Sequence, residues 1–291
     1  MYGRAPGVLG SATAAPTNGG NVTEESNTTQ TRRPLALVTG ASRGIGLELA
    51  KLFAQDGYDL VVVADSDTLD SAVSELASTG ATIVPVRADL RTEKGVEAVY
   101  AAVEEDGRPL AAAALNAGVG RGGSFADTPL ADTLAVIDLD VRSTVHLAKL
   151  ILDDMTRQGE GKVLFTSSVA STMPGPYHAV YNASKSFVQS FSEALHSELK
   201  GTAVTVTALM PGPTNTHFFS RAALDDTALG QGPKDDPAEV AKQGYDAMWR
   251  GERKVVASSV LSKVMAALDA ATPDAVKAAA HKVLARPGSG R

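Results

Sequence analysis

The sequence predicts an α/β protein built on a single doubly wound parallel sheet with helices on both faces. From residue 34 onward, short apolar runs alternate with helical patterns. The runs are nearly continuous in apolar residues, which is typical of strands that helices cover on both sides. A turn with three glycines follows the first run, and no second core pattern follows residue 200. We therefore expect one domain over residues 34–291.

The expected elements alternate along the chain. Strands are expected at 35–39, 59–64, 82–86, 111–115, 162–167, 203–209 and 253–257. Helices are expected at 44–55, 68–78, 93–104, 129–157, 178–200 and 237–249. The Ala-rich stretch 260–285 is expected to form one or two helices that break at Pro273. Residues 212–236 are rich in Gly, Pro and Asp, and we interpret this long irregular stretch as the substrate loop.

Composition argues against several classes of function. The net charge of −6 argues against a surface for nucleic acid or for an anionic membrane. Cysteine is absent and the five histidines lack ligand spacing, so we expect no metal. No stretch approaches the roughly 18 apolar residues of a membrane span. Residues 1–33 are rich in small polar residues, so we expect a disordered tail without a secretory signal, and a cytoplasmic protein.

The glycine turn lies between the first expected strand and the first expected helix. Gly40, Gly44 and Gly46 each require a positive φ or a close approach of backbone, because glycine otherwise costs chain entropy. Backbone N–H groups at such a helix N-terminus attract a pyrophosphate. Asp65 follows the second expected strand, where an acidic residue can accept hydrogen bonds from an adenosine ribose. The pattern therefore predicts a dinucleotide site.

At this point the chain resembles the short-chain dehydrogenase/reductase family. Thr39 precedes a Gly-x3-Gly-x-Gly turn, which matches the family's TGxxxGxG motif. The resemblance extends over about residues 34–258, through "RADL", "NAG", "FTSSVASTMPGPYHAVYNASK" and "PGPTNT". It implies a Rossmann fold and an NAD(P)-dependent oxidoreductase that transfers hydride between a nicotinamide and a carbonyl compound or secondary alcohol.

The resemblance also implies a cofactor site made of the glycine turn, the ends of the following strands and a segment that closes over the nicotinamide. Its expected residues are Gly40, Ser42, Arg43, Gly44, Ile45, Gly46, Asp65, Asp89, Leu90, Asn116, Ala117, Gly118, Tyr181, Lys185, Pro211, Gly212, Thr214 and Thr216.

Ser168, Tyr181 and Lys185 are the expected catalytic residues. Tyr181 and Lys185 lie four residues apart, so in a helix they share a face, and the ammonium should lower the pKa of the phenol. Tyr181 would then act as general acid in reduction and general base in oxidation, while Ser168 binds the substrate oxygen. Tyr177 is a rival tyrosine without a lysine four residues on, and strand alternation points the rival Ser167 to the opposite face.

Asp140 departs from the family pattern, which has an asparagine at this place to hold a proton-relay water. An aspartate there would oppose the Tyr181 phenolate and favour protonated Lys185. We therefore include Asp140 among the catalytic residues and hypothesise a raised pH optimum or slower proton exchange. The alternative is a tolerated substitution.

Two sequence features conflict on cofactor choice. Asp65 should accept hydrogen bonds from a free 2′-hydroxyl and repel a 2′-phosphate, which favours NAD. Arg43 could pair with a 2′-phosphate, but Ser66 stands where NADP-using relatives often have a second arginine. We expect NAD, with NADP as the alternative.

Residues 118–124, 169–177 and 212–236 are expected to line the substrate pocket. Phe218, Phe219 and Met173 hint at an apolar alcohol or ketone, although loop aromatics more often pack on their own loop. The resemblance implies a homodimer or homotetramer formed through the helices at 129–157 and 178–200. These helices have apolar residues beyond one stripe, although one face could simply cover the sheet. The expected interface candidates are Leu147, Leu150, Ile151, Phe187, Phe191 and Leu195.

Two other classes of function stay open. The chain could be a dinucleotide-binding sensor with weakened catalysis, of which Asp140 would be the first trace. It could also be a lyase, epimerase or dehydratase of the same fold, although such proteins usually have a longer substrate domain.

Overall fold

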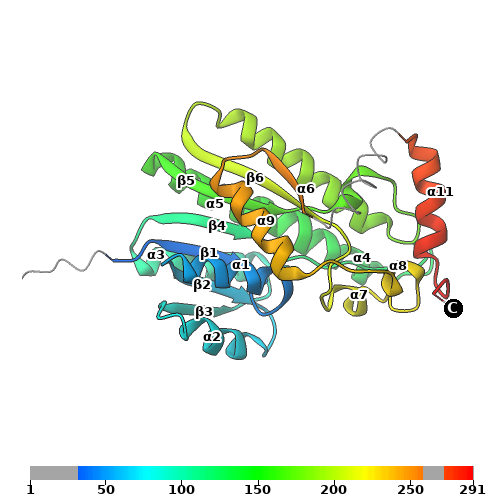
Figure 1. Cartoon of the computed structure of the whole chain (residues 1–291), viewed down its shortest axis with the longest axis horizontal. Helices are drawn as coiled ribbons and strands as arrows, with labels where there is room; N and C mark the ends of the chain where they lie inside the picture. Colours follow the sequence, from blue (N-terminus) through cyan, green and yellow to red (C-terminus); the bar gives the residue numbers. More distant parts are fainter. Residues whose placement is uncertain (1–31, 258–271, 291) are drawn as a thin grey trace, which may run out of the picture. The chain divides into compact units, whose positions relative to one another are not determined.

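Seven parallel strands form one sheet in the order β3-β2-β1-β4-β5-β6-β7 (Figure 1). The computed structural model of the chain describes residues 32–257 and 272–290. The strands are β1 (Leu35–Thr39), β2 (Asp59–Ala64), β3 (Ile83–Arg87), β4 (Leu110–Leu115), β5 (Glu160–Thr166), β6 (Ala203–Pro211) and β7 (Lys254–Ala257). The predicted doubly wound sheet is confirmed, with strand ends displaced by a few residues at most.

Helices cover both faces of this sheet. The helices of the described residues are α1 (Gly44–Gln55), α2 (Leu69–Ala77), α3 (Glu93–Asp106), α4 (Leu130–Ile137), α5 (Ser143–Gln158), α6 (Ala179–Glu198), α7 (Phe218–Arg221), α8 (Ala228–Gln231), α9 (Pro237–Trp249) and α11 (Asp274–Ala285). Two separate apolar cores result, because alternate residues of each strand point to opposite faces. Ala36 and Val38 of β1 pack with α1 and α9, whereas Leu35 and Leu37 pack with α3 and α5.

The strand order places a crevice at the carboxyl end of the sheet. β1 pairs with β2 on one side and with β4 on the other. The chain therefore reverses its direction of winding beside β1, and ligands of open α/β sheets bind in the crevice at such a switch point.

The helix expected at 129–157 is interrupted by a π-helical turn. α4 ends at Ile137, the π turn covers Asp138–Arg142, and α5 follows directly. The Ser143 hydroxyl donates to the carbonyl oxygen of Leu139 within this turn (2.5 Å). One-turn π segments often lie at functional sites, and this one turns the side chain of Asp140 into the interior, where it is 1% exposed.

The substrate loop is more regular than the sequence pattern indicates, whereas the C-terminal helix begins where the pattern predicts a break. The expected substrate loop at 212–236 contains α7 and α8, which enclose a small apolar core of Phe219, Ala222 and Leu224. α11 begins directly after Pro273. Residues 258–271 of the expected C-terminal helical stretch lie outside the described residues, as do residues 1–31 of the expected tail. The described helices include none that could span a lipid bilayer.

Candidate active site

A cavity of about 930 Å³ opens at the carboxyl ends of the strands. Most of the predicted site residues line it. They are Gly40, Ser42, Arg43, Gly44, Ile45, Asp65, Asp89, Leu90, Asn116, Ala117, Gly118, Ser168, Tyr181, Lys185, Pro211, Gly212, Thr214 and Thr216. Gly46 and Asp140 are the predicted residues that lie behind this lining. The crevice therefore brings residues from both halves of the chain to one cavity.

The three glycines of the first turn meet two different needs. Gly40 and Gly44 have positive φ angles of 69° and 56°. Gly46 is required by packing, because a Cβ there would lie 2.2 Å from the Gly40 carbonyl oxygen and 2.5 Å from Asn116 Nδ2. Among the described residues, no side chain caps the N-terminus of α1, and its first turn has no acidic residue. The unpaired N–H groups suit an anion such as a pyrophosphate.

Thr39 and Asn116 join three strand ends behind this turn. The Thr39 hydroxyl accepts hydrogen bonds from the backbone N–H groups of Asn116 (2.9 Å) and Ala117 (3.0 Å). The Asn116 amide donates to the Thr39 carbonyl (3.2 Å) and accepts from the Thr166 hydroxyl (3.1 Å). These bonds tie the ends of β1, β4 and β5 together, so the motif residues fix the shape of the crevice.

Charged side chains gather at one end of the cavity. Asp65 is about half exposed and lies 4.0 Å from the guanidinium of Arg221, which comes from α7. The Arg43 guanidinium donates to the Thr68 hydroxyl (3.1 Å). Asp89 forms a two-point ion pair with Arg91, which lowers the pKa of the carboxyl below its usual range. Arg221 adds a cation near Asp65 that the sequence pattern does not reveal.

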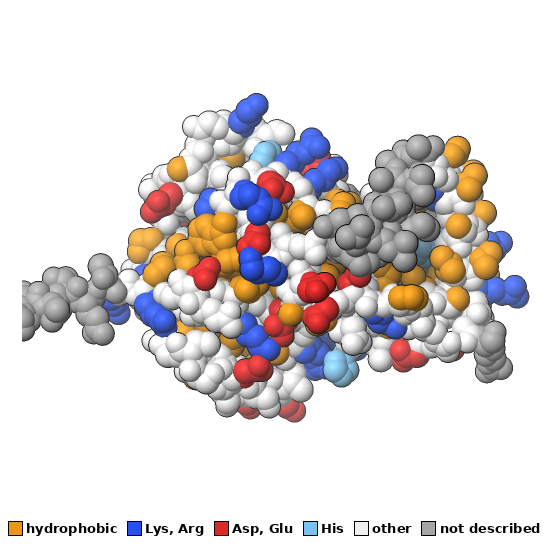
Figure 2. Space-filling view, in the orientation of Figure 1, with side chains coloured by type: hydrophobic (Ala, Val, Ile, Leu, Met, Phe, Trp, Pro, Cys, Tyr) orange, Lys and Arg blue, Asp and Glu red, His pale blue; other side chains and the backbone are white. Residues whose placement is uncertain are grey.

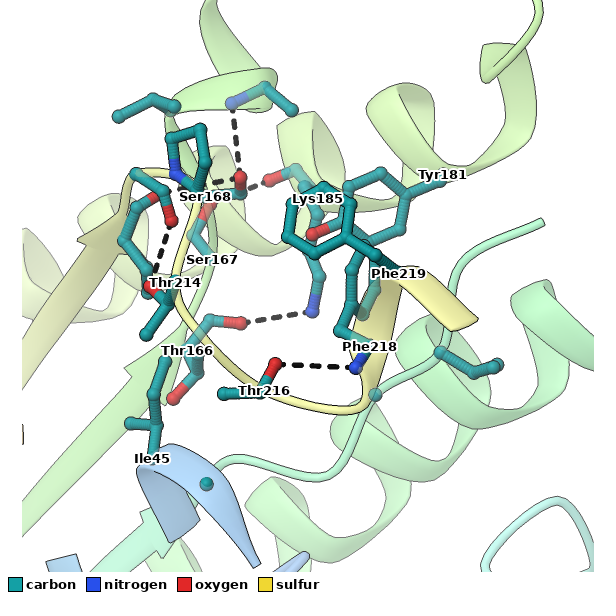
Figure 3. Close-up of a pocket in the computed structure, with 18 of the residues that line it drawn as sticks. Ile45, Thr166, Ser167, Ser168, Tyr181, Lys185, Thr214, Thr216, Phe218 and Phe219 are labelled. Atoms are coloured by element: carbon teal, nitrogen blue, oxygen red, sulfur yellow. Dashed lines mark hydrogen bonds between the residues drawn. The ribbon is translucent and has the colours of Figure 1, made fainter. Parts of the chain in front are cut away.

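Ser168, Tyr181 and Lys185 meet at the other end of the cavity (Figure 3). The Lys185 ammonium donates to the Thr166 carbonyl (3.1 Å) and lies 5.7 Å from the centre of the Tyr181 ring. Ser168 accepts a hydrogen bond from the backbone N–H of Ala170 (3.1 Å). The rival Ser167 hydroxyl instead donates to the Lys185 carbonyl (2.9 Å).

Asp140 contacts the lysine of this group directly. Its Oδ1 accepts from the backbone N–H of Val119 (2.8 Å), and its Oδ2 accepts from the Ser184 hydroxyl (3.2 Å). Oδ2 also lies 3.5 Å from Lys185 Nζ. Burial raises the pKa of the Asp140 carboxyl, and Lys185 opposes that rise.

The pKa of Tyr181 follows the effect expected of Asp140 and not the lowering expected of Lys185. Burial first, and then the charge of Asp140, raise the pKa of the Tyr181 phenol, while a hydrogen bond with Ser168 lowers it. The direction is opposite to that expected from Lys185 alone. The reason is that Lys185 has a carboxylate partner and that Tyr181 is 8% exposed, which disfavours the phenolate.

His178 was missed by the sequence argument. Its ring stacks on the Tyr181 ring with a centroid distance of 4.4 Å. Burial lowers the pKa of His178 to about 3, so the imidazole is neutral at physiological pH. The Phe218 ring lies 5.0 Å from the Tyr181 ring and completes this aromatic group.

The wall of the cavity differs in part from the predicted one. Residues 169–177 and 212–236 contribute as expected, whereas only Gly118 and Val119 of the stretch 118–124 line it. The C-terminal helix α11 forms another part of the wall and was not expected there. It contributes Lys277, Ala280, His281 and Leu284. Their spacing places them on one helix face, which the sequence displays but does not assign to a cavity.

Comparison with known proteins gives a consistent result. The family model for short chain dehydrogenases matches residues 34–226. Oxidoreductase UcpA of Salmonella typhimurium is 30% identical over 70% of this chain and 76% of that protein. Sulfoacetaldehyde reductase 2 of Chromohalobacter salexigens is 32% identical over 63% of this chain and 74% of that protein.

Solved structures resemble this one over most of their length. A short-chain dehydrogenase from Sphingobium yanoikuyae in complex with NADPH has a TM-score of 0.73 and 29% identity. The match covers 82% of this chain and 93% of that one. A short-chain dehydrogenase/reductase from Burkholderia phymatum in complex with NAD has a TM-score of 0.73 and 25% identity, over 80% and 92% of the two chains.

Proposed function

Because the chain belongs to the short-chain dehydrogenase/reductase family, we propose that it interconverts a carbonyl compound and a secondary alcohol with a nicotinamide cofactor. The observation that carries this proposal is that Ser168, Tyr181 and Lys185 line the same cavity as the glycine turn. The related structures with bound NADPH and NAD support the same class of cofactor.

The residues at the carboxyl edge of the sheet fit such a cofactor. The glycine turn offers unpaired N–H groups to a pyrophosphate, and Gly46 leaves no room for a side chain beneath it. Asp65 would accept hydrogen bonds from the adenosine ribose, and Asp89 and Leu90 would contact the adenine. The remaining predicted cofactor residues line the cavity from Asn116 to Thr216.

The chain's own residues account for binding and proton transfer. The bound nicotinamide would supply or accept the hydride. Tyr181 would donate its phenolic proton to the carbonyl oxygen in reduction and accept the proton in oxidation. Ser168 would donate a hydrogen bond to the same oxygen, where negative charge develops. Lys185 would hold the nicotinamide ribose, and Asp140 would hold Lys185 as an ammonium.

We propose NAD as the preferred cofactor, with NADP as the alternative. The carboxylate of Asp65 favours a free 2′-hydroxyl over a 2′-phosphate dianion. Arg43 and Arg221 oppose this preference, since both line the cavity and Arg221 lies 4.0 Å from Asp65. The two arginines should therefore make the preference moderate rather than absolute.

A dinucleotide-binding sensor with weakened catalysis is the second candidate function. The contact between Asp140 and Lys185, together with the raised pKa of Tyr181, favours it. Purified protein supplied with NADH or NADPH and a panel of ketones separates the two candidates. Consumption of the reduced nucleotide with formation of the alcohol supports the enzyme, whereas binding without consumption supports the sensor. Isomerised or dehydrated products would instead indicate a lyase, epimerase or dehydratase.

We also propose a homodimer or homotetramer formed through the predicted helices at 129–157 and 178–200, which the structure divides into α4, the π turn and α5, and α6. Leu147 and Ile151, two of the expected interface residues, are buried in the core that covers the sheet. Leu150, Phe191 and Leu195 are partly buried and pack against the same core, which leaves Phe187 exposed. Exposed apolar side chains remain on these two helices and beside them. They are Phe125, Leu130, Leu134, Ile137 and Phe187. Phe187→Glu should shift the protein to a smaller species in size-exclusion chromatography. A cytoplasmic location stays a prediction.

A further inference from the structure

The C-terminal segment 274–290, which we call the strap, forms part of the cavity wall. Two bonds tie α11 to the loop that precedes Tyr181. The Lys277 ammonium donates to the Thr172 carbonyl (3.2 Å), and His281 Nδ1 lies 3.1 Å from the Pro176 carbonyl oxygen. Figure 1 shows α11 in red beside α8. The helix is therefore anchored to the catalytic side of the cavity.

The end of the strap is anchored to the substrate loop on the other side. The backbone N–H of Gly288 donates to the Asp226 carboxylate (2.9 Å), and that of Gly290 donates to the Asp226 carbonyl (3.0 Å). The Ser289 hydroxyl accepts from the backbone N–H of Ala228 (2.9 Å). The strap thus connects the two predicted substrate-binding segments, and its position is fixed at both ends.

The two faces of α11 have different surroundings. Lys277, Ala280, His281 and Leu284 line the cavity. Val276 and Val283 point away from it and are 56% and 69% exposed. Figure 2 shows apolar side chains along this outer side of the molecule. The inner face is therefore the part of the strap that a ligand in the cavity would touch.

His281 lines the cavity, and among the described residues only its Nδ1 has a hydrogen-bond partner, which leaves Nε2 for a ligand. A carbonyl oxygen only accepts hydrogen bonds, so the bond to Pro176 requires the proton on Nδ1. Burial lowers the pKa of His281, which keeps the ring neutral near pH 7. A neutral imidazole protonated on Nδ1 has an unprotonated Nε2, which can accept a hydrogen bond but not donate one. The matching group on a ligand is a donor such as a hydroxyl.

The distance from Tyr181 sets where that hydroxyl would lie. The His178 ring contacts both other rings, at centroid distances of 4.4 Å to Tyr181 and 6.4 Å to His281. Among the described residues, the rings of Tyr181 and His281 form no contact with each other. His281 therefore faces the end of the substrate that is remote from the reacting carbon. Phe218, which contacts the Tyr181 and His178 rings, and Leu284 of α11 also line the cavity, which suits an apolar body.

We propose that His281 Nε2 accepts a hydrogen bond from a hydroxyl at the remote end of an apolar ketone or its alcohol. This inference rests on the proposed function. Lys277 serves a different purpose, because the Thr172 carbonyl and the Asp274 carboxylate at 3.8 Å bind its ammonium and hold the strap in place.

The test compares matched ketones with and without the remote hydroxyl. The pairs are 4-(4-hydroxyphenyl)-2-butanone with 4-phenyl-2-butanone, and 5-hydroxy-2-pentanone with 2-pentanone. The measured quantity is the ratio of kcat/KM within each pair, for the wild type and for His281→Phe. Dividing one ratio by the other cancels the intrinsic reactivity of the ketones. Val283→Ser, on the outer face of the same helix, is the matched control.

In at least one of the two pairs, we expect His281→Phe to lower the ratio of kcat/KM for the hydroxylated ketone over its partner by about fivefold to tenfold. This is the effect of one lost hydrogen bond. His281→Gln should restore part of the preference, and Val283→Ser should leave it unchanged. Nucleotide affinity checks that each variant is folded, and His281→Leu replaces the phenylalanine variant if that fails to fold. Equal ratios in the wild type and the His281 variants would overturn the inference alone. Absence of turnover with every ketone would overturn the proposed function, and this inference with it.

Discussion

The two ends of the cavity are built in different ways. At the predicted nucleotide end, the glycine turn and the strand ends present backbone groups, held by bonds such as those of Thr39 and Asn116. At the predicted substrate end, side chains from α6, α7 and α11 line the wall. The first end depends on the sheet itself, whereas the second depends on late segments that contact one another. The family fold therefore supplies the predicted cofactor site, and we expect the later segments to determine which substrate is bound.

The largest expected effect lies at the junction of the two ends. Tyr181→Phe should lower kcat by about 10²- to 10⁴-fold, because the variant lacks the proton that general acid catalysis requires. The dissociation constant for NADH should stay nearly constant, because the ring remains in place. Tyr177→Phe is the matched control, since Tyr177 is absent from the described cavity lining. Equal kcat values for the two variants would contradict the assignment.

The next effect tests the nucleotide end alone. Gly46→Ala should weaken NADH binding by more than about tenfold and lower the free energy of unfolding by about 1–3 kcal/mol. The cause is the missing room beside the Gly40 carbonyl oxygen.

Gly57→Ala provides the comparison, because Gly57 has a positive φ of 87° but open space around it. It should lower the free energy of unfolding by about 1–2 kcal/mol and leave the NADH affinity unchanged. Titration calorimetry and urea unfolding measure both quantities. An alanine at position 46 that binds NADH normally would contradict the packing argument.

The fold and the nucleotide end follow from the sequence because their signals are local. Gly46 approaches Gly40, only six residues earlier, so a single motif records the contact. The wall near His281 is different, because its partner Pro176 lies 105 residues away and only tertiary packing unites them. The π turn at Asp138–Arg142 also escapes the sequence pattern, since its residues suit an ordinary helix as well. Roles in catalysis and cofactor binding stay predictions that the variants test.

A smaller effect is expected for cofactor choice. Asp65→Asn should improve NADPH affinity relative to NADH by about tenfold, because a carboxylate no longer faces the 2′-phosphate. Arg221→Ala should shift the same ratio in the opposite direction, since it leaves the Asp65 charge without its neighbour. Asp67→Asn, at a nearby side chain that is 96% exposed, should leave the ratio unchanged. Dissociation constants for both nucleotides measure these shifts, and equal ratios in all three variants would refute the role of Asp65.

The smallest expected effect is a displaced pH profile in Asp140→Asn. The Asp140 charge raises the pKa of Tyr181, so its removal should lower that pKa. Alcohol oxidation requires the phenolate, so its rate should rise at a lower pH than in the wild type. Ketone reduction requires the protonated phenol, so its rate should also begin to fall at a lower pH. Asp138→Asn, in the same π turn, is the control. Identical profiles for Asp140→Asn and the wild type would favour a tolerated substitution.

A structure determined with NAD bound tests the whole account most directly. We predict the pyrophosphate against the N–H groups between Gly40 and Gly46, and the nicotinamide beside Tyr181. A nucleotide bound elsewhere, or a protein that takes up neither NAD nor NADP at millimolar concentration, would contradict it.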